Sequence, residues 1–426
     1  MLIISLLIGK LIIFLTRFLN IGGGSAAPGY YALKIYPGLT KKLVSQIPQN
    51  IIITGTNGKT TTSRLVAHFL KTQNIKVIKN STGSNLERGI ASSLIKAASF
   101  SGKISAEIGI WEVDEAAFNT VIKKIKPNLI VFLNVFRDQL DRYGEVDSVI
   151  NKWCDSLKTL NQDALIIVNG DDQNLLKLRS CYKGKIETFG LENYKIKDES
   201  LVKVREKGDL DLEAKEIKIN GLKGTDFTVS EGLKVSLPLP GIYHIYDFLA
   251  AFALGFNLNL EVNKMINSLE SYKVAFGRVE KLTINGKKVY IFLIKNPTGA
   301  SQIFEAVEGE MQPEDTLLFA LNDNFADGKD VSWIWDAEFE RIQNLELRIK
   351  NYASGIRAHD MAVRLKYAGF ETENIVLEPN PGKAFNKALK DLEGRLFIFP
   401  TYTAMLELQK ILARKGHKKK YWEEEG

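Results

Sequence analysis

The fold of this chain is decided by residues 51–70, "IIITGTNGKTTTSRLVAHFL". A β-branched run leads into a loop that contains Gly55 and Gly58, and a segment with a helical pattern follows. Glycines at these places let backbone N–H groups turn toward a phosphate, and the N-terminus of the following helix adds positive potential. The stretch therefore predicts a strand, a phosphate-binding loop and a helix.

The side chains of this loop supply the chemistry that nucleotide binding needs. Lys59 would place a positive charge on the β- and γ-phosphates, and Thr60 would offer its hydroxyl to Mg²⁺. We add Thr56, Asn57 and Thr61 to the candidate ATP site because they belong to the same loop and first helical turn. The spacing is shorter than the common G-x-x-x-x-G-K-[ST] pattern, and a plain glycine turn before a helix is the alternative interpretation.

Short β-rich runs alternate with longer helical segments after about residue 40. The runs are "NIIITG" (50–55), "IKVIKN" (75–80), "AEIGIWEV" (106–113), "NLIVFLNV" (128–135) and "ALIIVNG" (164–170). This alternation is typical of βα units around a mainly parallel sheet. Residues 184–236 contain short alternating pieces with N-G and K-G turns, which predict hairpins added to that sheet. A helix is expected at residues 246–258.

A second alternation begins after residue 277. It predicts a helix at 357–369 and strands at 315–323, 345–350, 374–379 and 395–400. The fold class is therefore α/β, with a central ATP-binding domain and a smaller C-terminal α/β domain. The expected divisions are an N-terminal helix with a glycine-rich linker (1–39), the central domain (40–276) and the C-terminal domain (277–426).

The composition describes a folded protein and leaves several partners open. The 426 residues are 45% hydrophobic and 25% charged, which excludes a mainly disordered chain. The net charge of +7 favours anionic partners such as nucleotides, phosphorylated substrates, nucleic acid or an anionic membrane without choosing among them. Two cysteines, Cys154 and Cys181, are too few for a disulfide framework and indicate a reducing compartment, with the cytoplasm as the default.

Residues 1–20, "MLIISLLIGKLIIFLTRFLN", are strongly apolar. Lys10 and Arg17 interrupt the run, and the charged region and cleavage site of a secretory signal are missing. The uninterrupted part is too short to cross a bilayer. Two interpretations remain open: a helix packed on the protein body, or an amphipathic helix at the membrane surface. A Gly/Ser/Pro loop is predicted over residues 20–33.

The short phosphate loop resembles that of the Mur ligase superfamily, and a neighbouring motif extends the resemblance. The segment "IGIWEVDEAAF" places Glu112 where the superfamily has a metal-binding glutamate. The phosphates of ATP need a hard cation held by oxygen ligands, so the resemblance implies that Thr60 and Glu112 hold Mg²⁺. A surface position at a strand end is the alternative for Glu112.

The segment "LNVFRDQLDRYGE" is similar to another part of the superfamily. Asn134, Asp138 and Asp141 match its pattern, but Gln139 and Tyr143 stand where the superfamily has histidines. These departures leave a second metal site open.

Three further segments resemble nucleotide-contacting parts of the superfamily. "IVNGDDQNL" supplies Asn169, Asp171 and Asp172, which an ordinary Asn-Gly-Asp turn would also explain. "LPGIYHIYDFLAAFALG" has His244 and Asp247 in place of asparagines. Both side chains can hydrogen-bond an adenine or a phosphate-bound water, although a buried aspartate near phosphates needs a partner. "AFGRVE" supplies Arg278, which the resemblance implies reaches the γ-phosphate when the last domain closes.

Segments along most of the chain resemble one branch of this superfamily, the MurT family. They are "FRDQLDRYGE", "LIKNPTGASQ", "LNDNFADGKDVSWIWDAEFE", "SGIRAHDMAVRLKYAG" and "PTYTAML". Members of this family are the ligase subunits of lipid II isoglutaminyl synthase. The resemblance implies ATP- and Mg²⁺-dependent conversion of the D-glutamate α-carboxylate of the lipid II stem peptide to D-isoglutamine through an acyl phosphate. It also implies a heterodimer with a GatD-like glutaminase. We expect a cytoplasmic location and no nucleic acid partner, and contact with the inner face of the membrane stays open.

The source of ammonia lies outside this chain. Cys154 and Cys181 lack the glycine-flanked turn of a glutaminase nucleophile, so the nitrogen must come from free ammonia or from a partner. The resemblance implies that an aspartate of the last domain completes the partner's Cys-His pair. We assign this role to Asp336, with Asp330 as the second choice and a helix or turn cap as the alternative. Trp333 and Trp335 would anchor the segment by burial.

Many relatives in this family carry a four-cysteine zinc ribbon in the middle domain. Residues 184–236 contain no cysteine, so no zinc is predicted. Two other hypotheses remain beside amidation. One is an amino-acid-adding Mur or folylpolyglutamate-type ligase. The other is a nucleotide-binding scaffold without turnover, which the altered residues Gln139, Tyr143, His244 and Asp247 would suit.

Overall fold

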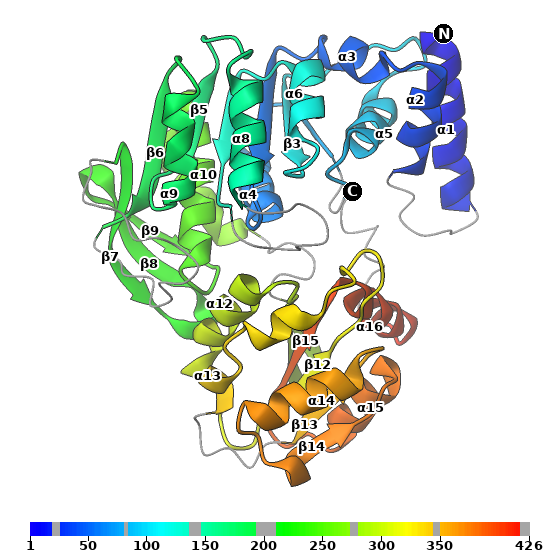
Figure 1. Cartoon of the computed structure of the whole chain (residues 1–426), viewed down its shortest axis with the longest axis vertical. Coiled ribbons are helices and arrows are strands. Elements are labelled where there is room, and N and C mark those ends of the chain that lie inside the picture. Colours follow the sequence, from blue (N-terminus) through cyan, green and yellow to red (C-terminus); the bar gives the residue numbers. More distant parts are fainter. Residues whose placement is uncertain are drawn as a thin grey trace.

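The computed structural model describes residues 1–18, 26–80, 84–135, 146–192, 210–272, 280–343 and 350–417. In this part of the chain the strands form two sheets, one of nine strands and one of six. Figure 1 shows the two sheets in separate halves of the molecule, the larger in the blue-to-green half and the smaller in the yellow-to-red half. The predicted α/β class is confirmed.

The larger sheet has the strand order β2-β3-β1-β4-β5-β6-β7-β8-β9. Its strands are β1 Gln49–Thr54, β2 Val77–Lys79, β3 Ile108–Val113, β4 Leu129–Phe132, β5 Leu165–Asn169, β6 Ile186–Leu191, β7 Leu212–Ile219, β8 Thr225–Val229 and β9 Leu233–Leu237. Neighbours from β2 to β7 are parallel, and β7, β8 and β9 pair antiparallel. Of the hairpins predicted over 184–236, the part from β7 to β9 is therefore present, whereas β6 in the same range is a parallel strand.

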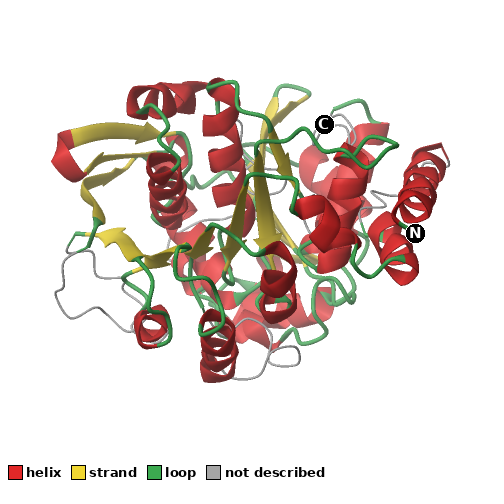
Figure 2. Ribbon diagram, turned by 90° about the horizontal axis from the view of Figure 1, so that it is seen from above, coloured by secondary structure: helices red, strands yellow, loops and turns green. Residues whose placement is uncertain are grey.

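Helices cover both faces of this sheet (Figure 2). They are α4 Lys59–Thr72, α5 Glu87–Ala97, α6 Phe118–Ile125, α8 Val146–Leu157, α9 Gln173–Leu176, α10 Tyr243–Asn257 and α11 Val262–Ser268. Ile51 and Ile53 of β1 pack into one core cluster, whereas Ile52 packs into the other. Because side chains of a strand alternate between faces, a strand covered on both sides must be apolar throughout, as "IIIT" is.

The smaller sheet has the order β10-β11-β15-β12-β13-β14, in which β10 and β11 are antiparallel and the other neighbours are parallel. Its strands are β10 Glu280–Ile284, β11 Lys287–Ile291, β12 Thr316–Ala320, β13 Asn351–Ser354, β14 Ile375–Leu377 and β15 Leu396–Pro400. Its helices are α12 Pro297–Glu308, α13 Glu340–Gln343, α14 Ala358–Tyr367, α15 Pro381–Lys390 and α16 Tyr402–Arg414. The strand predicted at 345–350 lies outside the described residues except for Lys350, which is not in a strand.

The N-terminal helix α1, Leu2–Phe18, packs on α2, Ala27–Ile35, and on α5. A further helix, α3, spans Leu39–Val44. The loop predicted over 20–33 is wrong for residues 27–33, which are helical. Pro28 fits the first turn of a helix, and a Cβ on Gly29 would lie 1.9 Å from the carbonyl oxygen of Arg88. Pro28 and Gly29 were interpreted as signs of a loop. In the structure the proline begins α2 and the glycine lets α2 lie against α5. No helix among the described residues is long and apolar enough to cross a membrane.

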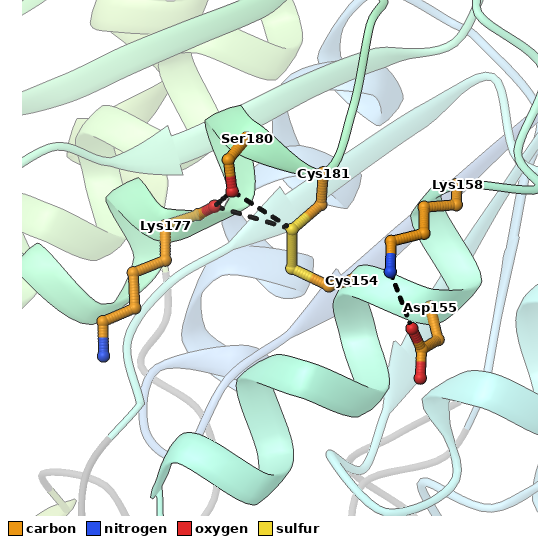
Figure 3. The surroundings of a disulfide bond; sticks show 6 residues. All are labelled: Cys154, Asp155, Lys158, Lys177, Ser180 and Cys181. Atoms are coloured by element: carbon orange, nitrogen blue, oxygen red, sulfur yellow. Dashed lines mark hydrogen bonds and ion pairs between the residues drawn. A yellow bond between two sulfur atoms is a disulfide. The ribbon is translucent and has the colours of Figure 1, made fainter.

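The two cysteines form a disulfide (Figure 3). Cys154 lies in α8, Cys181 follows the 3-10 helix Lys177–Ser180, and their Cα atoms are 5.1 Å apart. Two cysteines are too few for a framework but sufficient for one link. The number of cysteines therefore no longer indicates a reducing compartment.

The two halves of the molecule touch at the edge of the larger sheet. The amine of Lys281 in β10 donates to the carbonyl oxygen of Leu222, which lies in the 3-10 helix Gly221–Lys223. The Leu222 side chain packs into the core of the smaller half. The boundary expected near residue 277 lies outside the described residues.

Candidate active site

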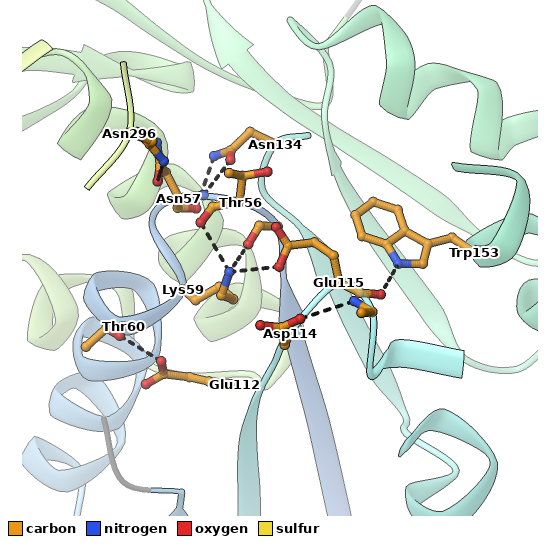
Figure 4. Close-up of polar contacts among 12 residues, drawn as sticks. Thr56, Asn57, Lys59, Thr60, Glu112, Asp114, Glu115, Asn134, Trp153 and Asn296 are labelled. Carbon is orange, nitrogen blue, oxygen red and sulfur yellow. Dashed lines mark hydrogen bonds and ion pairs between the residues drawn. The ribbon is translucent and has the colours of Figure 1, made fainter. Parts of the chain in front are cut away.

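The candidate site lies at the edge of the larger sheet where its parallel strands end. Strands β1, β3, β4 and β5 are neighbours, so the loops that follow them meet at one edge. Open parallel sheets bind ligands at this edge. Figure 4 shows residues from three of these loops beside the start of α4.

The phosphate loop is fastened to the end of β4. Gly55 has φ 138° and Gly58 has φ 88°, a region that favours glycine. Asn134 accepts the N–H of Asn57 at 2.8 Å through its side chain and the N–H of Thr56 at 3.0 Å through its backbone oxygen. Its amide also donates to the carbonyl oxygen of Asn57 at 3.1 Å. Asn134, which was singled out from the sequence, therefore holds the phosphate loop in place.

Lys59 is buried, with its amine surrounded by oxygen atoms. It lies 3.2 Å from the carboxylate of Glu115 and 3.2 Å from the carbonyl oxygen of Thr56, and it also donates to the carbonyl oxygen of Gly55. Sequence reasoning missed Glu115. The sequence offered one indication of its role: Glu115 is an acidic residue only three positions after Glu112, so it can lie beside the same loop.

Glu112 is fully buried at the end of β3. Its carboxylate accepts hydrogen bonds from Thr60 at 2.7 Å and from Ser63 at 2.6 Å. Asn80 fixes its backbone, accepting its N–H at 2.8 Å and donating to its carbonyl oxygen at 2.9 Å. The predicted pair Thr60 and Glu112 is therefore brought together, and neither Asn80 nor Ser63 was singled out from the sequence.

These oxygens suit Mg²⁺, which proteins bind through one or two carboxylates together with substrate phosphates and water. The described residues contain no group of three or more histidine, cysteine, aspartate or glutamate side chains placed to hold a metal ion. A cation held by Thr60 and Glu112 would therefore need further oxygens from a ligand.

Thr61 gives an independent sign of a ligand. The residue is 2% exposed, and its hydroxyl has no hydrogen-bond partner among the residues that the structure describes. A buried polar group without a partner costs about 1–3 kcal/mol. A phosphate in the loop would satisfy this hydroxyl, so the residues present fit a nucleotide.

His244 and Asp247 begin α10 and lie behind the loop. The imidazole Nδ1 of His244 is 3.1 Å from the carboxylate of Asp247, and both side chains are buried. The hydroxyl of Thr62 donates to Asp247 at 3.4 Å. A Cβ on Gly58 would lie 2.1 Å from an Asp247 carboxylate oxygen. The buried aspartate thus has the partner that its position requires, and its contact with a nucleotide stays a prediction.

Asn169 and Asp171 lie at the end of β5 but are used within the fold. Asp171 accepts the N–H of Leu191 at 2.8 Å and the hydroxyl of Tyr246 at 2.9 Å. The next residue, Asp172, accepts the N–H of Val135 at 2.8 Å, and burial raises the pKa of Asp172 to about 6. These contacts tie the β5 loop to β4 and β6. A nucleotide role for Asn169 or Asp171 is not tested.

A contact from the other half of the molecule reaches the phosphate loop. Asn296, the N-cap of α12, donates its amide to Asn57 Oδ1 at 3.0 Å and caps Gly299 N–H at 2.8 Å. Thr298, two residues after Asn296, is 5% exposed, and its hydroxyl has no partner in the described ranges. Sequence reasoning missed this contact because it joins residues 239 positions apart.

The segment "LNDNFADGKDVSWIWD" runs from β12 to η5, the 3-10 helix Ser332–Trp335. Its first half folds onto the start of α16. Asn322 donates to the Thr403 hydroxyl at 3.0 Å, and Asp327 accepts the N–H of Thr403 at 2.7 Å. Burial raises the pKa of Asp327. This half is therefore a capped, packed loop.

The second half presents Asp336 to solvent. Arg364 donates to the carbonyl oxygens of Ile334 and Ala337 at 2.8 Å each, which holds the backbone on both sides of Asp336. Asp336 is exposed, and its carboxylate has no partner among the described residues. The Asp330 carboxylate, in contrast, accepts the N–H of Ser332 at 2.8 Å. The carboxylate of Asp330 therefore caps a turn, which was the alternative role considered for Asp336, whereas the carboxylate of Asp336 does not.

One expectation for this segment is wrong. Trp333 is buried, but Trp335 is 50% exposed and meets Tyr367, also exposed, edge to face at 5.7 Å. The Trp335 ring lies over Arg364, which already holds the backbone. The segment is anchored by Trp333 and Arg364, and Trp335 lies on the surface.

Several candidate residues lie outside the described residues. They are Asp138, Gln139, Asp141, Tyr143 and Arg278. Their roles, including the second metal site, stay predictions.

Comparisons with known proteins show the family of the chain. The family model of the Mur ligase middle domain matches residues 53–255, and that of the MurT ligase C-terminal domain matches residues 293–405. The lipid II isoglutaminyl synthase (glutamine-hydrolyzing) subunit MurT of Streptococcus pneumoniae is 31% identical, over 92% of this chain and 93% of that protein. The subunit of the same name from Staphylococcus aureus gives the same three values.

Among solved structures, the MurF ligase of Thermotoga maritima in complex with ADP is similar in fold. The match covers 93% of this chain and 85% of that chain, with a TM-score of 0.66 and 17% sequence identity. At that identity the likeness supports the fold alone.

Proposed function

The chain belongs to the MurT family of Mur ligases, and from this premise we propose that it is the ligase subunit of a lipid II isoglutaminyl synthase. In this proposal it uses ATP to convert the D-glutamate α-carboxylate of the lipid II stem peptide to the amide. The observation that carries the proposal is the buried phosphate loop with Lys59, Thr60 and Glu112, in a chain 31% identical to MurT subunits over 92% of its length.

The first step forms an acyl phosphate. A carboxylate oxygen of the substrate attacks the γ-phosphorus, and the bond from that phosphorus to ADP breaks. Lys59 lies where it can leave Glu115 and bind the transferring phosphoryl group, and Arg278 would add a second positive charge there. Mg²⁺ held by Thr60 and Glu112 would neutralise phosphate charge.

The second step forms the amide. Ammonia attacks the activated carbonyl carbon, the carbon–oxygen bond to phosphate breaks, and the nitrogen loses one proton. The acyl phosphate must be protected from water, so the smaller half should cover the site during the reaction. The Asn57–Asn296 contact supports this arrangement, because it already joins α12 to the phosphate loop.

We further propose that ammonia comes from a GatD-like glutaminase that docks over η5. The exposed carboxylate of Asp336 would orient the partner's catalytic histidine, as the acid of a triad does. Two features support the choice: Arg364 fixes the backbone around Asp336, and the exposed Trp335 and Tyr367 supply aromatic surface typical of interface anchors.

The proposal is tested by incubating the purified chain with lipid II, ATP, Mg²⁺ and ammonium and analysing the product by mass spectrometry. An amidated stem peptide is expected. A product that carries an added amino acid, in a mixture supplemented with amino acids, would instead identify an amino-acid-adding ligase. ATP that is bound but never hydrolysed would identify a scaffold.

A further inference from the structure

The side of α1 that faces away from the protein is apolar along the whole helix. We call it the outer α1 face. Its large side chains are 42% to 76% exposed, and they are Ile3, Ile4, Leu7, Leu11, Phe14, Leu15 and Phe18. Their spacing of three and four residues places them in one stripe. The Arg17 side chain lies outside the described residues.

The opposite side of α1 fixes the helix to the body, so the stripe cannot turn inward. Leu6 is fully buried, and a Cβ on Gly9 would lie 2.8 Å from Ile95 of α5. The amine of Lys10 donates to the carbonyl oxygen of Ala98 at 2.5 Å, so this charge is directed at the body. Figures 1 and 2 both place α1 at the rim of the larger half, on the side away from β7 to β9.

Aromatic and basic residues flank the outer α1 face. Phe100 is 69% exposed, and the amine of Lys10 lies 5.1 Å from its ring centroid. Its loop packs on α1, because a Cβ on Gly102 would lie 3.2 Å from Leu6. Three exposed lysines lie on segments next to α1: Lys34 on α2, Lys96 on α5 and Lys103 in the loop of Phe100. Aromatic rings and basic side chains around an apolar stripe are typical of a helix at a membrane interface.

The N-terminal quarter of the sequence, which contains α1, α2 and α5, is strongly cationic. Residues 1–106 contain 13 lysines and arginines and one acidic residue, Glu87, for a formal charge of +12. The whole chain carries +7, so residues 107–426 carry −5. A cationic region attracts an anionic surface and repels a second copy of itself. This complementarity favours an anionic bilayer over self-association as the occupant of the outer α1 face.

We propose that the outer α1 face binds the surface of a bilayer that contains anionic phospholipids. The apolar stripe enters the boundary between headgroups and acyl chains, and Lys34, Lys96 and Lys103 contact the headgroups. The inference goes beyond the proposed function and does not depend on it, because it concerns α1 and its surroundings alone. If both hold, the ATP site works beside the membrane that carries its substrate.

Co-sedimentation of the full chain with vesicles tests this proposal without any enzymatic turnover. We expect binding to vesicles of phosphatidylcholine and phosphatidylglycerol, and at least about tenfold weaker binding to phosphatidylcholine alone. The variant Leu7→Ser/Leu11→Ser/Phe14→Ser should lose at least about tenfold in affinity. The matched control Ile219→Ser/Phe256→Ser/Leu377→Ser removes three other exposed apolar side chains and should bind within about twofold of the parent chain.

Two charge-reversal variants test the electrostatic contribution to vesicle binding. Lys34→Glu/Lys96→Glu/Lys103→Glu should weaken binding to the anionic vesicles by about tenfold or more, whereas Lys383→Glu/Lys387→Glu/Lys390→Glu on α15 should not. Circular dichroism checks that each variant is folded. The proposal would be overturned if Leu7→Ser/Leu11→Ser/Phe14→Ser, the α1 variant, bound the anionic vesicles as tightly as the parent chain, or if the parent chain bound no vesicles. Lipid-free self-association in sedimentation equilibrium that the α1 variant abolishes would overturn it too.

Discussion

The amine of Lys59 lies 3.2 Å from the carboxylate of Glu115, and both side chains are buried beside the phosphate loop. The pair gives the loop a charged lysine before any nucleotide arrives. A bound phosphate would compete with Glu115 for the same amine, and without one the carboxylate holds Lys59 in place.

Lys59→Met should abolish ATP-dependent amidation, even with ammonium supplied. Removing one preorganised charge at a reacting centre typically costs about 10²- to 10³-fold in kcat, and this lysine also binds the ground-state nucleotide. The variant also leaves Glu115 buried and unpaired, which should cost about 3–5 kcal/mol of stability. The double variant Lys59→Met/Glu115→Gln should recover stability in urea unfolding but not activity. Activity in the double variant would contradict the role given to Lys59.

Glu112→Gln should raise the Mg²⁺ concentration that supports ADP formation by at least about tenfold, because the amide is a weaker ligand for a hard cation than a carboxylate. The change keeps the shape of the side chain, so unfolding should change little. Asp114→Asn is the matched control, since its carboxylate accepts the N–H of Ala116 in the same loop. An unchanged Mg²⁺ dependence in Glu112→Gln would remove Glu112 from the metal site.

Asp336→Asn should lose glutamine-dependent amidation in the presence of the glutaminase partner while keeping ammonium-dependent amidation. The carboxylate is exposed and outside the ATP site, so a loss of about 10³-fold or more in the glutamine assay alone is expected from a triad acid. Asp330→Asn should keep both activities, because its carboxylate caps a local turn. Loss of both activities in Asp336→Asn would sink the triad assignment.

Asp172 should make stability depend on pH. Burial raises its pKa from 3.8 to about 6, so the folded chain holds this proton more tightly than the unfolded chain does. Between about pH 4 and pH 6 the unfolding free energy contributed by Asp172 therefore falls as pH rises, by about 3 kcal/mol in total. The unfolding free energy of the parent chain minus that of Asp172→Asn, measured in urea, should fall as pH rises through this window and stay constant above it. A flat difference for Asp172→Asn would refute the assignment.

Local patterns predicted the parts of the site that lie close together in the sequence. Gly55 and Gly58 adopt the positive φ values that the loop requires, and Glu112 is the last residue but one of the strand in which it was expected. What the loop touches depends on tertiary structure. Asn296 contacts Asn57 from the N-terminus of α12 in the smaller half, and Arg364 holds the backbone around Asp336 from α14. No periodicity in one sequence reports such contacts.

Two errors have physical causes of the same kind. Pro28 and Gly29 carry loop signals, yet proline suits the first turn of a helix and glycine suits the close approach of α2 to α5. Trp335 was expected inside because it is large and apolar, but Trp333 and Ile334 already fill the core at that point. Hydrophobicity predicts that a residue can be buried, and the available space decides which one is.

The central claim is that ATP activates the stem-peptide carboxylate by phosphorylating it. The most direct measurement uses lipid II labelled with ¹⁸O in the D-glutamate α-carboxylate, with ATP, Mg²⁺ and ammonium. An acyl phosphate predicts that each amide formed leaves one ¹⁸O atom in inorganic phosphate. Label in AMP, or amide formed with unlabelled phosphate, would contradict the account.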